Sequence, residues 1–285
     1  TVLSRGLGDV YKRQGGNGQL SKSFMNKYSS QFEIISLSKD KLNISIENDI
    51  KMAILDYSPD IIINCAAMTN VDECEANFKR AKKINSIPIK NFAKYFKGLF
   101  IQISTDYVFD GESGPYDEQD KTNPINNYGK SKLLAEQYTI KHFKNFLILR
   151  TNILFDYDSK SSFLTWVVKN SKFENEIKVV YDQYNNPIWV DDMSLIIFNS
   201  IKKNLRGLYH IGSSKIISRY EFAKLINEVF ELDYKKIHKV DSSYLKLLAK
   251  RPKLSGLISN KIIKDLNIEA IDLYQSLKRL KEKIN

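Results

Sequence analysis

Tyr128 and Lys132 stand four residues apart, a spacing that on a helix places a phenol and an ammonium on one face. Such a pair suits the reduction of a ketone, because the carbonyl oxygen must take a proton that a phenol can supply. A nearby ammonium favours the phenolate, so Lys132 is expected to lower the pKa of Tyr128. The spacing alone carries little information, because Tyr220 and Tyr274 also precede a lysine by four residues.

The segment before Tyr128 distinguishes it from the other two tyrosines. The apolar stretch 99–104 is predicted to be a strand. Polar residues stand at its end: Ser104, then Thr105 and Asp106. Ligands of open parallel sheets bind beyond the carboxyl ends of strands, where Thr105 would lie. Its hydroxyl is expected to donate or relay a hydrogen bond to the carbonyl oxygen. We therefore predict Thr105, Tyr128 and Lys132 as the catalytic residues.

The first half of the chain alternates strand-like and helix-like segments. Strands are predicted at 32–37, 60–65, 99–104 and 146–150, with helices at 47–57, 73–97 and 126–142 between them. This alternation predicts an α/β protein with a Rossmann-type, doubly wound parallel sheet. Residues 1–150 would form a dinucleotide-binding domain, whose first 14 residues are atypical.

The second half has shorter elements and predicts a smaller α/β substrate-binding lobe over residues 151–285. Helices are expected at 161–171, 192–203, 219–231 and from 272, and strands at 177–181 and 207–212. No low-complexity linker separates the halves. A segment near 190–212 is expected to return to the Rossmann domain.

A glycine turn precedes the first predicted helix and would hold the pyrophosphate of a dinucleotide at the helix N-terminus. Its candidate cofactor contacts are Gly15, Asn17, Gly18, Gln19 and Leu20. Ser21 replaces the usual third glycine, and a surface loop is the alternative interpretation. The preceding segment, 9–14, is mostly polar where a buried apolar strand is expected. Damage to that strand would weaken both stability and cofactor binding.

The residues after the second predicted strand bear on the choice of cofactor. Ser38 and Lys39 suit the additional phosphate of NADPH, whereas the neighbouring Asp40 would accept the ribose hydroxyls of NADH. We expect NADPH, and NADH stays open.

Several stretches in fixed order resemble the extended short-chain dehydrogenase/reductases, and within them the dTDP-4-dehydrorhamnose reductase family. The resemblance covers about residues 15–280. Its matches are 64–72 with Glu75, Asn85, 104–111, 115–118, Pro124, 128–133 with Glu136, Arg150 and Thr151, Asp182 and Gln183 with Pro187, and Arg251 and Pro252. The resemblance implies reduction of the C4 ketone of a dTDP-linked deoxysugar, which would supply an activated sugar for surface polysaccharide.

The resemblance also assigns roles to single residues. Ala66, Ala67 and Thr69 would line the cofactor, and Asn85 would support the lysine. Close packing of the alanines and a surface position for Asn85 are the alternatives. Tyr128 and Lys132 would also contact the cofactor, with Lys132 holding its ribose.

Candidate substrate contacts are Asp106, Tyr107, Asn152, Trp189 and Arg251. The family usually has an aromatic residue near 153, where this chain has isoleucine, which puts the identity of the sugar in doubt. Trp189 is a candidate to replace that aromatic face, although a core tryptophan is an equally good interpretation. Arg251 is a candidate for the diphosphate, with a surface arginine as the alternative.

Composition excludes several classes of function. The formal charge is +11, but basic residues are interleaved with acidic ones along the chain, so no nucleic-acid partner is expected. No apolar run is long enough to cross a membrane, no secretory signal is recognisable, and a cytoplasmic location follows as the expectation. The two cysteines form no metal-binding pattern, and no metal is predicted.

Three alternatives to a reductase stay open at this point. One is a non-catalytic regulatory subunit, as in relatives of the family that are partners of methionine adenosyltransferase. Another is a sugar-nucleotide epimerase, since the same scaffold hosts several chemistries. A third, suggested by the unusual N-terminus, is an inactive protein. The sequence leaves a homodimer open.

Overall fold

A six-stranded sheet forms the centre of the molecule in the computed structural model, which describes residues 1–5, 18–157, 162–172, 176–232 and 237–284. The strand order is β10-β5-β4-β3-β1-β2. The strands are β1 (Val2–Arg5), β2 (Glu33–Ser36), β3 (Ile61–Asn64), β4 (Leu99–Thr105), β5 (Phe146–Thr151) and β10 (Gly207–Ile211). The four strands predicted in the first half are confirmed to within two residues.

One strand runs against the others. β3, β4, β5 and β10 are parallel neighbours, whereas β1 is antiparallel to both β2 and β3. The expected parallel sheet is therefore correct except at β1. The polar segment 9–14, for which we predicted a damaged strand, lies outside the described residues.

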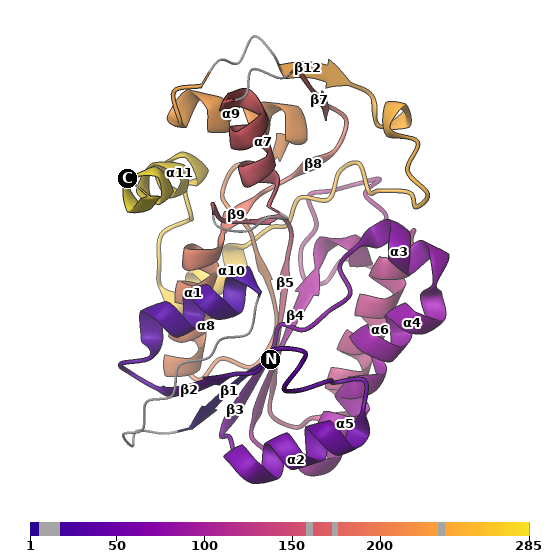
Figure 1. Cartoon of the computed structure of the whole chain (residues 1–285), viewed down its shortest axis with the longest axis vertical. Coiled ribbons are helices and arrows are strands. Elements are labelled where there is room, and N and C mark those ends of the chain that lie inside the picture. Colours follow the sequence, from indigo (N-terminus) through magenta and orange to yellow (C-terminus); the bar gives the residue numbers. More distant parts are fainter. Residues whose placement is uncertain (6–17, 158–161, 173–175, 233–236, 285) are drawn as a thin grey trace.

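Helices cover both faces of the sheet, as a doubly wound fold requires (Figure 1). Successive strand residues point to opposite faces, so Ile63 packs in one core and Ile62 in the other. The first face carries α1 (Gln19–Tyr28), α8 (Val190–Lys202) and α10 (Asn260–Leu266), and the second carries α2 (Glu47–Tyr57), α5 (Ile87–Tyr95) and α6 (Asn127–His142).

The single helix predicted over 73–97 is wrong. The chain forms α3 (Val71–Ala76), α4 (Phe78–Asn85) and α5 in its place. The Asn77 side chain accepts a hydrogen bond from the amide of Arg80 and so caps a new helix. Pro88 lies in the first turn of α5, where a missing amide hydrogen is tolerated, and it would break a continuous helix.

The second lobe has its own apolar core above the sheet (Figure 1). It contains α7 (Phe163–Lys172), α9 (Arg219–Val229), α11 (Leu273–Ile284) and the parallel pair β7 (Ile177–Val180) and β12 (Ile237–Val240). The remaining short elements are the pairs β6 (Leu154–Phe155) with β9 (Ile188–Trp189) and β8 (Tyr184–Asn185) with β11 (Ile217–Ser218), and the 3-10 turns η1 (Asp106–Val108) and η3 (Ser242–Leu245). Between these lobe segments, α8 and β10 return to the central sheet.

Candidate active site

A cavity of about 660 Å³ opens at the carboxyl edge of the sheet, beside the strand-order reversal at β1 and β3. Ligands of open α/β sheets bind at this position. Five predicted cofactor residues line the cavity: Gly18, Ser38, Lys39, Ala66 and Ala67. Gly15 and Asn17 lie outside the described residues.

Three other predicted cofactor residues lie differently. Leu20 is buried in the core between α1 and the sheet. Thr69 is exposed and does not line the cavity. Gln19 donates from Nε2 to the Leu154 carbonyl at 3.2 Å, and its buried Oε1 has no hydrogen-bond partner in the described part of the chain.

Asn85 is almost fully buried, which rules out the surface position that was its alternative. Its Oδ1 accepts from the Met68 amide at 2.7 Å, and its Nδ2 donates to the Met68 carbonyl at 3.1 Å and to Ser131 Oγ at 2.8 Å. Asn85 therefore fastens the loop after β3 to α6. It holds the neighbour of Lys132 and not the lysine itself.

The three predicted catalytic residues converge where β4 meets α6. Thr105 is the last residue of β4, and its Oγ1 donates to Asp106 Oδ1 at 3.0 Å. Tyr128 lies in the first turn of α6 and forms a side-chain hydrogen bond with Thr105. Asn126 caps this helix by accepting from the Gly129 amide at 2.8 Å, which fixes where α6 begins. The Lys132 ammonium, one turn further on, donates to the Ile103 carbonyl at 2.6 Å.

Burial dominates the protonation of both groups. It raises the pKa of Tyr128 above its ordinary value, an effect that the Thr105 hydrogen bond only partly offsets. We expected Lys132 to lower the pKa of Tyr128. That expectation is wrong for the net shift, because desolvation of the phenol raises this pKa. Burial lowers the pKa of Lys132 to about 8, against the opposing field of Glu136. Tyr128 is thus a neutral phenol, able to donate a proton, throughout the neutral pH range.

Asp106 and Tyr107 lie beside Thr105 in the turn η1. Asp106 is buried, and its Oδ2 accepts from Ser255 Oγ at 2.6 Å. Desolvation raises its pKa to about 6, although the hydrogen bonds from Ser255 and Thr105 and the charge of Arg219 oppose this rise. The Tyr107 ring packs edge-on against the ring of Tyr128, with 5.7 Å between centroids.

Two residues at this site, Arg219 and Ser255, were not predicted from the sequence. Arg219 forms a side-chain hydrogen bond with Tyr107 and acts electrostatically on Asp106. Arg219 begins α9 and Ser255 follows β12, so both come from parts of the chain far from the 104–132 stretch. The capping sequence at Ser218 and Glu221 marks the start of α9, but no sequence pattern connects it with Asp106.

The three remaining substrate candidates are dispersed. The Asn152 amide donates to Asn186 Oδ1 at 2.5 Å, while its own buried Oδ1 has no partner among the described residues. Arg251 pairs with both Asp72 oxygens, at 2.8 and 2.9 Å, beside a second cavity of about 1030 Å³ that Tyr181 and Gln183 also line.

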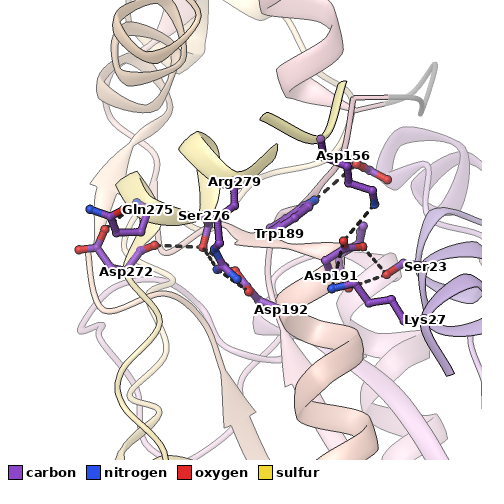
Figure 2. A network of polar contacts seen from close by, with 12 residues as sticks. Ser23, Lys27, Asp156, Trp189, Asp191, Asp192, Asp272, Gln275, Ser276 and Arg279 are labelled. Atoms are coloured by element: carbon purple, nitrogen blue, oxygen red, sulfur yellow. Dashed lines mark hydrogen bonds and ion pairs between the residues drawn. The ribbon is translucent and has the colours of Figure 1, made fainter. Parts of the chain in front are cut away.

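Trp189 belongs to the core of the second lobe and not to either cavity. Its ring is 3% exposed, its indole N–H donates to Asp156 Oδ1 at 3.4 Å, and Lys27 and Arg279 lie over its ring (Figure 2). Cations of the protein itself therefore already contact this ring. The structure does not bring Trp189 to the sugar position that we predicted, and it favours the alternative of a core tryptophan.

The described residues contain neither a metal-binding cluster nor a membrane-spanning helix. They contain no group of three or more His, Cys, Asp or Glu side chains that could hold a metal ion. No helix among them is both long and apolar enough to span a membrane.

Comparisons with known sequences agree over nearly the whole chain. The family model described as RmlD substrate binding domain matches residues 13–285. The dTDP-4-dehydrorhamnose reductase of Sinorhizobium fredii is 30% identical over 280 residues, which cover 93% of this chain and 94% of that protein. The spore coat polysaccharide biosynthesis protein SpsK of Bacillus subtilis is 33% identical over 224 residues, covering 75% and 77% respectively.

Similarity also extends to a protein with a different name and to solved structures. Methionine adenosyltransferase 2 subunit beta of Danio rerio is 31% identical over 201 residues, which cover 67% of this chain and 62% of that protein. The crystal structure of dTDP-4-dehydrorhamnose reductase from Bacillus anthracis in complex with NADP matches with a TM-score of 0.89 at 30% identity, covering 94% of this chain and 97% of that one.

Proposed function

The chain belongs to the RmlD substrate binding domain family, and we propose that it reduces the C4 ketone of a dTDP-linked deoxysugar with NADPH. The observation that carries this proposal is the convergence of Thr105, Tyr128 and Lys132 at the end of β4. Tyr128 packs in one apolar cluster with Met68 and Ile84, and these two residues line the cavity of about 660 Å³. The reductase of Sinorhizobium fredii and the NADP-bound structure from Bacillus anthracis support the substrate and the cofactor.

The residues of the cavity fit an anionic dinucleotide. Lys39, Arg80 and Lys83 line it together with a single carboxylate, that of Asp40. Arg80 also pairs with Glu73. The surplus of positive charge favours the additional phosphate of NADPH over the ribose hydroxyls of NADH.

Unpartnered polar atoms at the same edge of the sheet support a bound group as well. Gln19 Oε1, Thr151 Oγ1 and Asn152 Oδ1 are buried and have no hydrogen-bond partner among the described residues. Leaving such atoms unpaired is costly, and a bound molecule can supply the missing partners. Gly18 and Ser38 would then hold the dinucleotide, with Ala66 and Ala67 against it.

The proposed mechanism assigns one task to each residue. The bound cofactor supplies the hydride for the ketone carbon. Tyr128 keeps its proton at neutral pH and transfers it to the ketone oxygen, while the Thr105 hydroxyl orients the phenol through their hydrogen bond. Lys132 would hold the ribose of the cofactor, and its ammonium would stabilise the phenolate that remains after proton transfer. Asp106 and Tyr107 would position the sugar, with Arg219 and Ser255 holding these two in place.

The product would be an activated sugar for a surface polysaccharide, in keeping with the name of the Bacillus subtilis relative. A homodimer, a cytoplasmic location and the absence of a nucleic-acid partner stay predictions.

The direct test is to incubate the purified protein with NADPH and dTDP-4-dehydro-L-rhamnose and to follow the nicotinamide absorbance. We expect oxidation of NADPH by the wild type and a loss of kcat of about 100-fold or more in Tyr128→Phe. Tyr220→Phe and Tyr274→Phe are matched controls, because each also precedes a lysine by four residues, and both should retain full activity.

Failure of the wild type to oxidise NADPH with any 4-keto nucleotide sugar would refute the reductase. The similarity to methionine adenosyltransferase 2 subunit beta makes a regulatory subunit the first alternative to examine in that case.

A further inference from the structure

A buried polar cluster lies beneath Lys132, and the proposed mechanism does not use it. It consists of Ser104 on β4, Glu136 on α6, Arg150 on β5 and His210 on β10, and each is at most 4% exposed. Glu136 Oε1 accepts from Ser104 Oγ at 2.5 Å and from Arg150 Nε at 2.9 Å, and its Oε2 accepts from Arg150 NH2 at 2.7 Å. Both carboxylate oxygens are therefore fixed in place.

His210 completes the cluster as a neutral ring. Its Nε2 lies 3.2 Å from Arg150 NH1, and its Nδ1 lies 3.1 Å from the Tyr116 carbonyl. A guanidinium only donates and a carbonyl only accepts, so Nε2 accepts while Nδ1 carries the hydrogen. Burial and the neighbouring Arg150 charge lower the pKa of His210 to about 3. The cluster therefore contains one anion, Glu136, and one cation, Arg150.

The position of Glu136 on α6 relates the cluster to the reaction. Tyr128, Lys132 and Glu136 recur every four residues and lie on one face of the helix. All three meet the end of β4: Tyr128 contacts Thr105, Lys132 donates to the carbonyl of residue 103, and Glu136 accepts from the hydroxyl of residue 104. The alignment of α6 on β4 therefore depends on Glu136 as well as on the two predicted catalytic residues.

We propose that Glu136 is a positioning residue of the reductase site: held by Arg150 and Ser104, its carboxylate aligns α6 with the end of β4 and places a fixed negative charge one helical turn from the Lys132 ammonium. This inference rests on the proposed function, because it assigns Glu136 a part in that reaction. It concerns a residue that touches neither cavity.

The charges around Lys132 support the electrostatic half of the proposal. Burial lowers the pKa of the ammonium to about 8, and the negative charge of Glu136 is the largest effect that opposes this lowering. Cys65, just after β3, could oppose it only as a thiolate, and burial raises the pKa of that thiol. Arg150 on β5 adds positive charge behind Glu136, and His210 on β10 adds none. Removing the Glu136 charge alone would thus leave the Arg150 guanidinium without the carboxylate that now neutralises it.

The first test compares Glu136→Gln with a control at a second carboxylate, Asp192→Asn. Asp192 is also buried, accepts from a serine, Ser276, and pairs with an arginine, Arg279. In Glu136→Gln we expect the pKa of Lys132, followed by NMR of 13C-labelled lysine, to fall by about one unit. The basic limb of the pH profile of kcat should shift by the same amount, and kcat should fall on the order of tenfold with little change in KM. Asp192→Asn should change none of these.

A double variant, Glu136→Gln with Arg150→Met, covers the case in which the single variant does not fold, because it removes both buried charges together. Its Lys132 pKa should lie closer to that of the wild type than in the single variant, while kcat stays low because the alignment is lost. An active wild type, with Lys132 titration and kcat unchanged in these variants, overturns the positioning role alone. A wild type that reduces no 4-keto nucleotide sugar overturns both proposals, whatever the lysine titration shows.

Discussion

Two buried carboxylates of this protein are held in the same way but in different surroundings. Glu136 and Asp192 each accept from a serine hydroxyl and pair with an arginine. The side chain of Arg150, the partner of Glu136, is 5% exposed, whereas that of Arg279, the partner of Asp192, is 50% exposed. A carboxylate, a serine and an arginine therefore form a desolvated cluster under the candidate active site and a half-solvated cluster at the seam between α8 and α11.

Asp192 belongs to a cluster of charged residues at this seam, which also contains its neighbour Asp191. Asp191, the neighbour of Asp192, accepts from Ser23 on α1 at 2.6 Å and pairs with Lys283 on α11 at 3.0 Å, and Lys27 also contacts it (Figure 2). Both aspartates lie in the first turn of α8, where the helix dipole favours negative charge. This cluster joins three helices and has no link to Tyr128 or Lys132. The surroundings of a carboxylate–arginine pair, more than its own geometry, therefore decide how much the pair affects stability and the reaction.

The largest expected difference between the two clusters appears when the arginine is removed. Arg150→Ala leaves Glu136 as a buried charge that has lost its guanidinium partner, and we expect a loss of about 3–5 kcal/mol in the free energy of unfolding. Arg279→Ala exposes Asp192 to water and should cost about 0–1 kcal/mol. Urea unfolding of the two variants measures both values. Equal losses would show that burial does not separate the clusters.

The second difference is a loss of stability between pH 6.5 and pH 5, which the cluster at Glu136 should show because it contains His210. The pKa of His210 is lowered to about 3 in the folded chain, against an ordinary value of 6.5. The unfolded chain therefore binds the proton first, so the stabilising effect of the neutral ring is complete above pH 6.5 and is lost as the pH falls toward 3. The loss is roughly 1.4 kcal/mol per pH unit at most, or about 2 kcal/mol at pH 5.

His210→Gln isolates this effect, since an amide can both donate and accept but does not titrate. The difference in unfolding free energy between wild type and variant should shrink by about 2 kcal/mol between pH 7 and pH 5. A constant difference for His210→Gln across this range would contradict a neutral, buried ring.

Most strands of the central sheet, and the site residues that lie close together in the chain, could be predicted from the sequence. Thr105, Tyr128 and Lys132 lie within one strand, turn and helix, and their types and order were enough to bring them together. Arg219 and Ser255 were missed because they reach Asp106 only through the packing of the second lobe. The effect of Lys132 on Tyr128 was misjudged for a related reason: spacing reveals the charge on a neighbour, whereas desolvation depends on the whole surrounding structure.

The smallest expected effect concerns Trp189, for which the sequence left open a substrate contact and a place in the core. In the cluster of Asp191 and Asp192 its ring lies under Lys27, Arg279 and Lys283, at 5.3 to 5.5 Å from the centroid. Trp189→Phe keeps an aromatic face but loses the bond to Asp156, so we expect a loss of about 1 kcal/mol in stability. The KM for the nucleotide sugar should not change, because the ring does not line either cavity. A several-fold rise in KM without a loss of stability would return Trp189 to the substrate site and link the seam cluster to the reaction after all.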